Sequence, residues 1–210
     1  AGAAGDGFRR AICGASVADD DALILGFVRR AEDRLAVDSA VVRAQWVEMA
    51  VARGALARTT AVRTATSSET GWYTLCGAPA GGAIMLRAAR GADSTESLSI
   101  EVPKAGFLKR DLYFGRAQVV TGDVGAAPAD SLALSLGVRR TGTGRLTGIV
   151  LGAQTGEPIA NARIGVVNGS QTRSDASGRF TLTALPTGTR TLEVRAVGRY
   201  PVIMPVDIVD

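Results

Sequence analysis

The two halves of this 210-residue sequence repeat one another. Residues 26–28 (Gly-Phe-Val) align with residues 148–150 (Gly-Ile-Val) at an offset of 122 positions, and residues 71–75 (GWYTL) align with residues 178–182 (GRFTL) at an offset of 107. The offset falls because the first copy carries 15 additional residues between positions 46 and 66. Each copy is roughly 70 to 90 residues long, the size of a small domain. The repeat therefore predicts two tandem domains that share one fold.

Short runs of alternating apolar residues dominate both copies, and turn residues such as Gly and Pro interrupt them at short intervals. This pattern is typical of antiparallel β-sandwiches. Hydrophobic residues make up 46% of the chain but aromatic residues only 5%, so the cores must be packed from Ala, Val, Leu and Ile. The expected strands of the first copy are residues 23–29, 40–52, 59–65, 72–76, 84–89, 98–102 and 107–114, and those of the second are residues 145–151, 162–167, 179–183, 191–196 and 202–209.

The additional residues of the first copy have an ambiguous composition. Residues 42–57 are rich in Ala and Arg, which favour helices. They fall, however, where the repeat requires a connection between two strands, and an extension at such a connection is most simply a longer hairpin. We therefore expect a long β-hairpin at this position.

Histidine is absent from the sequence, and only two cysteines are present. A Ser-His-Asp triad, a Cys-His pair, a His-bearing zinc site and a four-thiolate metal site are therefore excluded. The neighbouring carboxylates Glu32 and Asp33 would point to opposite faces of a strand, which does not suit shared acid–base catalysis. We expect no enzyme activity, no metal site and no cofactor.

The cysteines lie at position 13, before the first expected strand, and at position 76, at the end of the fourth. A disulfide between Cys13 and Cys76 would fasten the N-terminal arm to the first domain, and closing so long a loop would add about 4 kcal/mol of stability on the loop-entropy model. The alternative is a pair of buried free thiols.

The chain begins with AGAAG, small residues of the type that follows a signal-peptidase cut, and contains no apolar run of the 18 residues that a membrane span needs. We expect a secreted or cell-surface protein after removal of a signal peptide, with no membrane span. The net charge is +4, but the arginine pairs at positions 9–10, 29–30 and 139–140 are scattered and not interleaved with aromatic residues. This is not the pattern of a nucleic-acid interface, and solubility, salt bridges or contact with acidic polysaccharide explain the arginines more simply.

The second copy contains GRLTGIVLGAQTGEPIANARIGVV at residues 144–167 and TRSDASGRFTLTALPTGTRTLEVRAVG at residues 172–198. In this order of strand, turn and aromatic elements it resembles the carboxypeptidase regulatory-like domain, a prealbumin-like sandwich appended to many exported proteins. The first copy resembles a more divergent member over residues 22–115, through LILGFVRR, AVDSAVV and SETGWYTLCGAPAGG. The resemblance implies an all-β fold of two tandem Greek-key Ig-like β-sandwich domains that act as structural, linking or binding units without catalysis.

The repeat divides the chain into four parts: an N-terminal arm (residues 1–12), a first sandwich (13–116), a linker (117–143) and a second sandwich (144–210). In the first copy a further strand follows Val102, whereas the offset of 107 aligns Val102 with Val209, one residue before the last. We therefore expect the second sandwich to lack its last strand. A missing strand leaves backbone groups unpaired and an apolar groove open.

Two segments are candidates to fill this groove. Residues 131–137 (SLALSLG) alternate and could fold back within the same chain, whereas the N-terminal arm could insert into another subunit by strand donation. The expected donor residues are Gly7, Phe8, Arg9, Arg10, Ala11 and Ile12. The expected acceptor-groove residues are Leu146, Ile149, Val202, Met204, Val206 and Ile208.

Head-to-tail strand donation produces a fibre unless the rotation between subunits closes a ring. The function we expect is a structural subunit of an extracellular bacterial filament, pilus-like and homopolymeric, assembled by exchange of the arm into the incomplete second domain of another subunit. The alternative is an exported module that binds glycans or proteins and does not polymerise.

Overall fold

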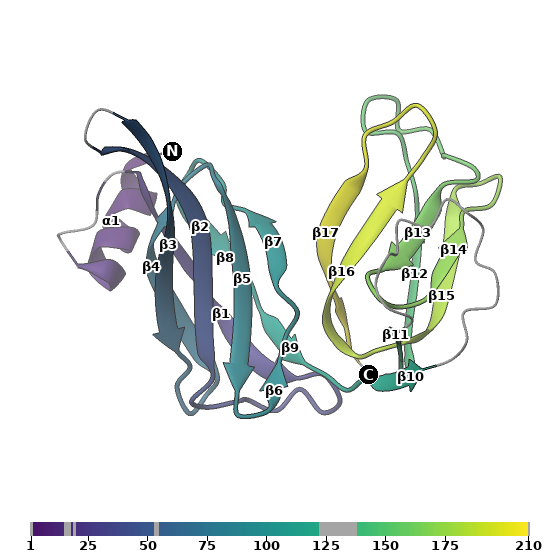
Figure 1. The fold of residues 1–210 in the computed structure, drawn as a ribbon, viewed down its shortest axis with the longest axis horizontal. Helices are drawn as coiled ribbons and strands as arrows, with labels where there is room; N and C mark the ends of the chain where they lie inside the picture. The colour runs from purple at the N-terminus through teal and green to yellow at the C-terminus, as the bar shows by residue number, and fades with distance from the viewer. Residues whose placement is uncertain (1, 15–17, 19, 53–54, 122–137, 210) are drawn as a thin grey trace. The chain divides into compact units, whose positions relative to one another are not determined.

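A computed structural model describes residues 2–14, 18, 20–52, 55–121 and 138–209. The chain separates into two compact units, one of residues 1–30 and 34–114 and the other of residues 31–33 and 115–210 (Figure 1). Each unit is built almost entirely of β-strands arranged as a sandwich of two layers. The all-β class and the two sandwich domains expected from the sequence are confirmed.

The first unit has one layer in the order β4-β1-β8, with β9 also paired to β1, and a second layer in the order β3-β2-β5, with β6 and β7 paired to β5. Its elements are α1 (Gly2–Cys13), β1 (Asp21–Arg30), β2 (Val41–Ala52), β3 (Ala55–Thr66), β4 (Trp72–Pro79), β5 (Ala83–Arg90), β6 (Asp93–Ser94), β7 (Leu98–Glu101), β8 (Phe107–Lys109) and β9 (Leu112–Phe114).

The second unit has one layer formed by β12 and β15 and another in the order β14-β13-β16-β17, and it also contains the antiparallel pair β10 and β11. Its strands are β10 (Gln118–Thr121), β11 (Val138–Thr141), β12 (Gly144–Ile149), β13 (Arg163–Val166), β14 (Gln171–Arg173), β15 (Arg179–Leu185), β16 (Gly188–Arg195) and β17 (Val202–Ile208).

The two units share their strand register residue by residue. In the first unit Gly26 of β1 lies opposite Tyr73 of β4, and in the second Gly148 of β12 lies opposite Phe180 of β15. The sequence repeat aligns the same residues, Gly26 with Gly148 and Tyr73 with Phe180. The duplication inferred from the sequence is therefore also a duplication of structure.

The turn before each aromatic strand requires a glycine. Gly71 and Gly178 have φ angles of +77° and +74°, and a Cβ on Gly178 would lie 2.6 Å from the Val150 carbonyl oxygen. In the second unit Asp175 Oδ1 accepts hydrogen bonds from the hydroxyl and N–H of Ser177, both at 2.8 Å, and from the N–H of residue 179 at 2.9 Å. These bonds, that of the Ser177 hydroxyl above all, hold the pKa of the exposed Asp175 carboxyl below its usual value.

Ser67 and Ser174 occupy equivalent buried positions beside these turns. Ser174 Oγ accepts a hydrogen bond from the Ala162 N–H at 2.9 Å and donates one to the Ile159 carbonyl at 2.7 Å. Ser67 makes the two equivalent bonds in the first unit, also at 2.9 and 2.7 Å. Each hydroxyl thereby satisfies main-chain groups that the turn removes from the sheet ladder.

Two local features bear on the sequence predictions. The additional residues of the first copy form the expected hairpin, in which β2 pairs with β3 along all twelve residues of each strand. The N-terminal arm differs, because α1 contains all six residues expected to form an extended donor strand. The four-residue spacing of Phe8 and Ile12 is compatible with one face of a helix as well as with one face of a strand.

We expect Ser67→Ala to destabilise the first domain, and Ser174→Ala the second, by about 1–3 kcal/mol each, because a buried N–H loses its acceptor. The measurement is denaturant unfolding of each variant against the wild type. Ser99→Ala is the matched control, since Ser99 is exposed on β7 and surface changes of this kind stay within about 0.5 kcal/mol. Equal stability of all three variants would contradict the assigned role of the two serines.

Candidate functional site

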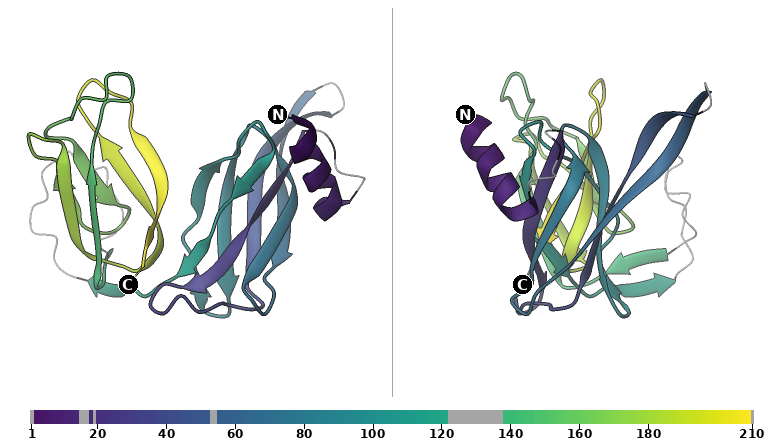
Figure 2. Two further views of the ribbon diagram at one scale, coloured as in Figure 1. Left: turned by 180° about the vertical axis from the view of Figure 1, so that it is seen from behind. Right: turned by 90° about the vertical axis from the view of Figure 1, so that its left-hand side faces the viewer.

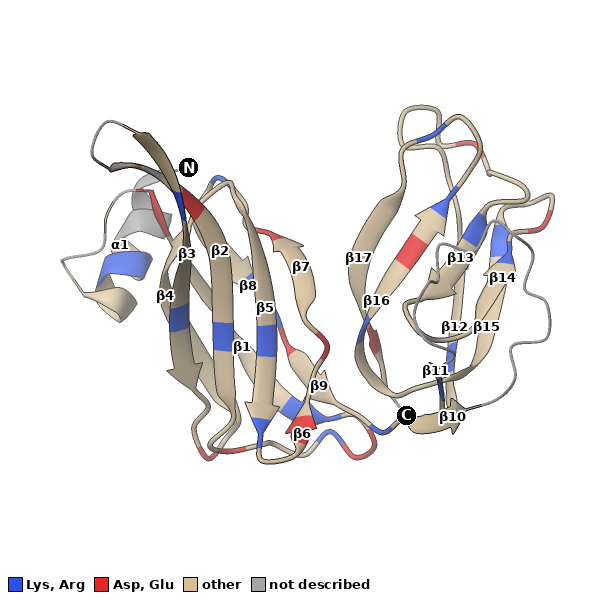
Figure 3. Ribbon diagram, viewed as in Figure 1, with Lys and Arg blue, Asp and Glu red and all other residues tan. Residues whose placement is uncertain are grey.

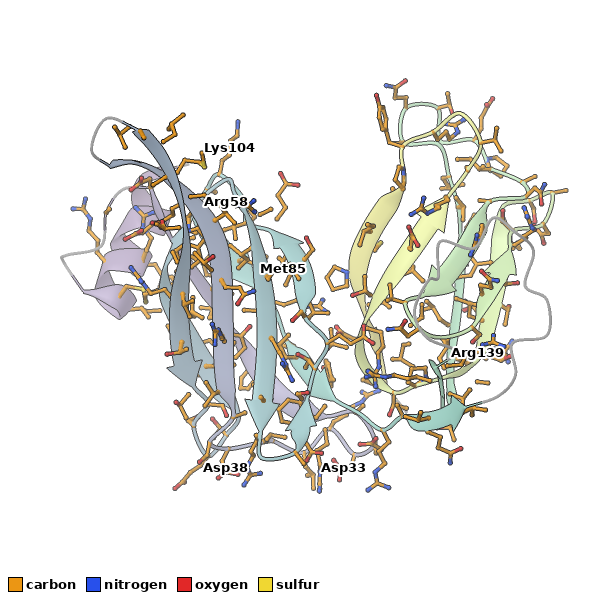
Figure 4. The ribbon with its side chains drawn as sticks, viewed as in Figure 1. Asp33, Asp38, Arg58, Met85, Lys104 and Arg139 are labelled. Atoms are coloured by element: carbon orange, nitrogen blue, oxygen red, sulfur yellow. A yellow bond between two sulfur atoms is a disulfide. The ribbon has the colours of Figure 1, made fainter. Side chains whose placement is uncertain are left out.

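In the first domain, β8 and β9 cover one edge of β1. Both pair with β1 in parallel, Ile24 lying opposite Leu108 and Val28 opposite Leu112. Between the two strands the Arg110 N–H donates to the Leu25 carbonyl at 2.8 Å. The turn that leads from β7 into β8 contains Lys104 (Figure 4). The edge of β1 is thus paired by residues that follow β7 directly.

The same segment closes the side of the core. Leu112 and Phe114 are buried in the core cluster, and Leu108 packs against it. Between β8 and β9 the Arg110 carbonyl comes so close to Gly26 that a Cβ there would lie 2.0 Å from its oxygen. The Tyr73 hydroxyl donates to this carbonyl at 2.6 Å. Burial of Tyr73 raises its pKa above the ordinary value.

In the second domain β12 is the counterpart of β1, but its equivalent edge, which we call the open edge, has no partner strand among the described residues. β12 pairs with β15 on one side, and no strand of the described part of the chain pairs with it on the other. In the first domain the N–H of Phe27 points to this side and donates to Asp111 Oδ1 at 3.0 Å. By the shared register, the N–H of Ile149 points to the open edge of β12.

The core beside this edge is correspondingly less covered. Ile24, Val28 and Tyr73 are completely buried in the first domain, whereas their counterparts Leu146, Val150 and Phe180 are partly exposed and pack only against the margin of the core cluster. The Phe180 ring lies over Gly148, where a Cβ would be 2.6 Å from Cε1. It fills the place that the Arg110 carbonyl occupies in the first domain.

β17 borders the same opening from the other layer. Met204 lies opposite the buried Leu192 of β16, so both side chains point toward the core. Yet Met204 is 45% exposed, whereas Leu98 on the equivalent strand β7 is completely buried. Strand pairing also makes Ile208 the counterpart of Val102, one residue from the Val209 that the constant offset suggested.

We call the partly exposed, core-facing residues Leu146, Val150, Phe180, Val202, Met204 and Val206 the acceptor face. Of the six acceptor-groove residues expected from the sequence, Leu146, Val202, Met204, Val206 and Ile208 point to the core side. Ile149 does not: it lies on the opposite face of β12 and is 49% exposed. Val150 and Phe180 were missed, although the repeat offsets alone would have identified them as counterparts of buried core positions.

The N-terminal arm covers the outer face of the first domain, the face of the β4-β1-β8 layer that points away from the core (Figure 2). Three outward side chains lie in a row there, because Leu23 is opposite Cys76 on one side and Phe107 on the other. α1 contacts both ends of the row: Cys13 forms a disulfide with Cys76, and the Phe8 ring lies 6.1 Å from the Phe107 ring. The disulfide is the pairing that the sequence predicted.

The helix docks with an unusual distribution of side chains. Arg9 is 5% exposed and donates a hydrogen bond from Nη1 to the Asp21 carbonyl. Phe8 and Ile12, the large apolar residues of the predicted donor segment, are 49% and 39% exposed. The arm therefore leaves much of its apolar surface uncovered while it is helical.

The second domain has no need of such a helix. The repeat places Arg145 and Thr183 at the positions of Leu23 and Cys76, and both are exposed. A polar outer face can remain in water, whereas the apolar row of the first domain must be covered.

Other classes of site find no support in the described residues. Lys and Arg occur on strands of both units, and in the first unit the basic bands of β3, β2 and β5 lie side by side, with Arg43 opposite Arg87 (Figure 3). No three acidic or cysteine side chains of the described part come together as a metal site. None of the described helical residues forms a helix long and apolar enough to cross a bilayer. The alternative donor, residues 131–137, lies outside the described residues.

We expect the double variant Cys13→Ser/Cys76→Ser to lose about 4 kcal/mol of unfolding free energy, because the bond closes a loop of 63 residues. Denaturant unfolding under oxidising conditions measures this loss. Under reducing conditions the wild type should unfold like the variant. A wild type insensitive to reductant would show that the bond does not form.

The stability of the first domain should fall as pH rises above about 10. The unfolded state then ionises Tyr73 at its ordinary pKa, whereas burial raises the pKa in the folded state, so the stabilisation present below pH 10 is lost above it. Thermal unfolding from pH 8 to 11 tests this, with Tyr73→Phe as the comparison. An equal alkaline decline in both proteins would assign the decline to other groups.

Residues 145–209 match the carboxypeptidase regulatory-like domain. The match covers the second copy, and the first copy, which shares its register, lies outside the matched residues. No curated protein matches the chain. Among solved structures it is similar to a streptococcal ancillary pilin at 12% identity and a TM-score of 0.29, covering 89% of this chain and 59% of that one. It is also similar to the minor pilin GBS52 of Streptococcus agalactiae at 11% identity and a TM-score of 0.31, covering 89% and 91% of the two chains. These likenesses are distant and carry no argument about function.

Proposed function

We propose that the chain is a structural subunit of an extracellular filament, in which the N-terminal arm of one subunit adds a strand to the open edge of β12 in another. The observation that carries the proposal is this edge, together with the acceptor face beside it. An exposed sheet edge with apolar surface pairs readily with another chain. Strand addition satisfies the main-chain groups and covers the side chains in one step.

Because donor and acceptor are different surfaces, each subunit gives one strand and receives one. A contact of this type continues from subunit to subunit unless the rotation closes a ring. The Cys13–Cys76 disulfide supports an extracellular site of assembly, since such bonds persist in oxidising compartments.

The arm must leave its helical state to act as a strand. α1 is twelve residues long and contains Gly5 and Gly7 beyond its first residue. Each of these two glycines disfavours helix by about 1 kcal/mol relative to Ala, and isolated helices of this length are marginal. Phe8 and Ile12, already partly exposed, lose little on release. The disulfide keeps the base of the arm attached while residues 2–12 unwind.

We expect the native protein to form fibres visible by negative-stain electron microscopy, and Phe8→Asp/Ile12→Asp to abolish them. The charged residues cannot enter an apolar acceptor face, whereas both positions tolerate polarity in the helical state because they are partly exposed. The matched control is Val197→Asp/Tyr200→Asp, which places two charges on exposed apolar positions of the second domain, at 104% and 97% exposure.

Fibres in the arm variant would refute the arm as donor. A native protein that stays monodisperse at high concentration would refute assembly altogether. The remaining function would then be the non-polymerising module that binds glycans or proteins.

A further inference from the structure

From the duplicated register we infer the orientation and alignment of the donated strand: the arm of a second copy lies parallel to β12, with Phe8 beside Leu146 and Ile12 beside Val150. This inference rests on the proposed function and specifies its contact. The first domain supplies the template, because there the equivalent edge is already filled by β8 and β9.

The template fixes both direction and register. β8 and β9 run parallel to β1, with Leu108 opposite Ile24 and Leu112 opposite Val28. The residue numbers of paired positions differ by the same amount in β8 and in β9. The break between the two strands therefore neither adds nor removes a residue. A strand that runs through without the break would therefore keep the same alignment.

The arm matches this template in sequence. Residues 8–12 read Phe-Arg-Arg-Ala-Ile, and residues 108–112 read Leu-Lys-Arg-Asp-Leu. Large apolar residues stand at both ends, at positions that point to the core in the template, and two basic residues follow the first of them in each segment. Transferred to the second domain, Phe8 meets Leu146 and Ile12 meets Val150, two members of the acceptor face.

The single chemical difference within the match is Ala11 in place of Asp111. Asp111 is needed in the template because the Arg110 carbonyl turns inward over Gly26, and the Asp111 carboxylate instead accepts the Phe27 N–H. In the second domain the Phe180 ring fills the place of that carbonyl. The donated strand consequently passes without an inward bulge, and one of its main-chain carbonyls accepts the Ile149 N–H. A carboxylate is then not needed at the position of Asp111, so Ala11 can occupy it.

Mixing pairs of variants that each carry one additional cysteine tests the orientation and register of the strands between chains. Gly7→Cys and Ala11→Cys mark the arm, and Arg145→Cys and Ile149→Cys mark the exposed face of β12. All four positions are exposed, and a Cβ on Gly7 meets no atom within 4 Å. The native disulfide stays intact, and heterodimers are read on non-reducing gels after mild oxidation.

A parallel arm in this register cross-links Gly7→Cys with Arg145→Cys, and Ala11→Cys with Ile149→Cys. The crossed mixtures give no heterodimer, because four residues of strand separate the partners by about 13 Å, beyond the reach of a disulfide. Heterodimers in the crossed mixtures alone would show an antiparallel arm, and heterodimers in none would show that the arm does not pair with β12. Either result overturns the inference.

Two variants at position 149 test the main-chain bond separately from the side chain. Ile149→Pro removes the N–H that faces the open edge, whereas Ile149→Ser keeps it and removes only an exposed side chain. With thermal unfolding unchanged in both, we expect the proline variant to lose the cross-link between Gly7→Cys and Arg145→Cys and the serine variant to retain it. Equal cross-linking of the two would overturn the assigned bond.

The outcomes separate the inference from the proposed function. Correct cross-links from a protein that forms no fibres would refute the filament and leave the contact standing. Fibres that depend on Phe8 and Ile12 but lack these cross-links would refute the register and leave the filament standing.

Discussion

The pairing of a strand along the second edge of β1 is the interaction on which the first domain depends. Through it, β8 and β9 satisfy the main chain of β1 and carry Leu112 and Phe114 into the core. The second domain shows the burial of side chains beside the open edge of β12, with which no strand of the described residues pairs. Residues that are completely buried in the first domain have partly exposed counterparts on both β12 and β17, while the register of every other shared strand pair is retained. The edge therefore governs the burial of the core margin but not the topology.

The helix α1 covers an apolar side chain that β1 places on the outer face of the first domain. Leu23 points away from the core and would be exposed on the outer face, between Cys76 and Phe107. In the second domain the equivalent position is Arg145, and no cover is required. The disulfide, the Arg9 bond to Asp21 and the ring contact of Phe8 all serve to hold a weak helix over this row. Cover of the outer face and the proposed supply of a donor strand would thus make competing demands on the same residues.

Four features were predicted because each corresponds to a pattern in the sequence. The duplication follows from the constant offset and the sandwich class from the alternation of apolar residues. The hairpin of β2 and β3 follows from the insertion at a connection, and the disulfide from the presence of two cysteines. The helical state of the arm corresponds to no such pattern, since Phe8 and Ile12 suit both a helix face and, four positions apart, one face of a strand. The expectation that Ile149 lines the groove rested on its apolar side chain alone. It did not take into account that Ile149 lies on the face of β12 opposite to that of Val150. Phe180 was not among the residues expected in the groove, because the position of its ring over Gly148 depends on the spatial arrangement beside the edge of β12.

In the filament proposed above, competition between the two uses of the arm would set the thermodynamics of assembly. Release of residues 2–12 would uncover Leu23 and break the Arg9 bond, whereas insertion into another subunit would cover Leu146, Val150 and Met204 and pair the edge of β12. The disulfide limits the loss, because Cys13 stays against Cys76 and keeps one end of the apolar row covered. It would also fix the point from which a donated arm extends, which would reduce the number of unfolded conformations that compete with the donated strand. A helix this rich in glycine has little intrinsic stability, so the balance is decided by tertiary contacts at the two docking places rather than by helix propensity.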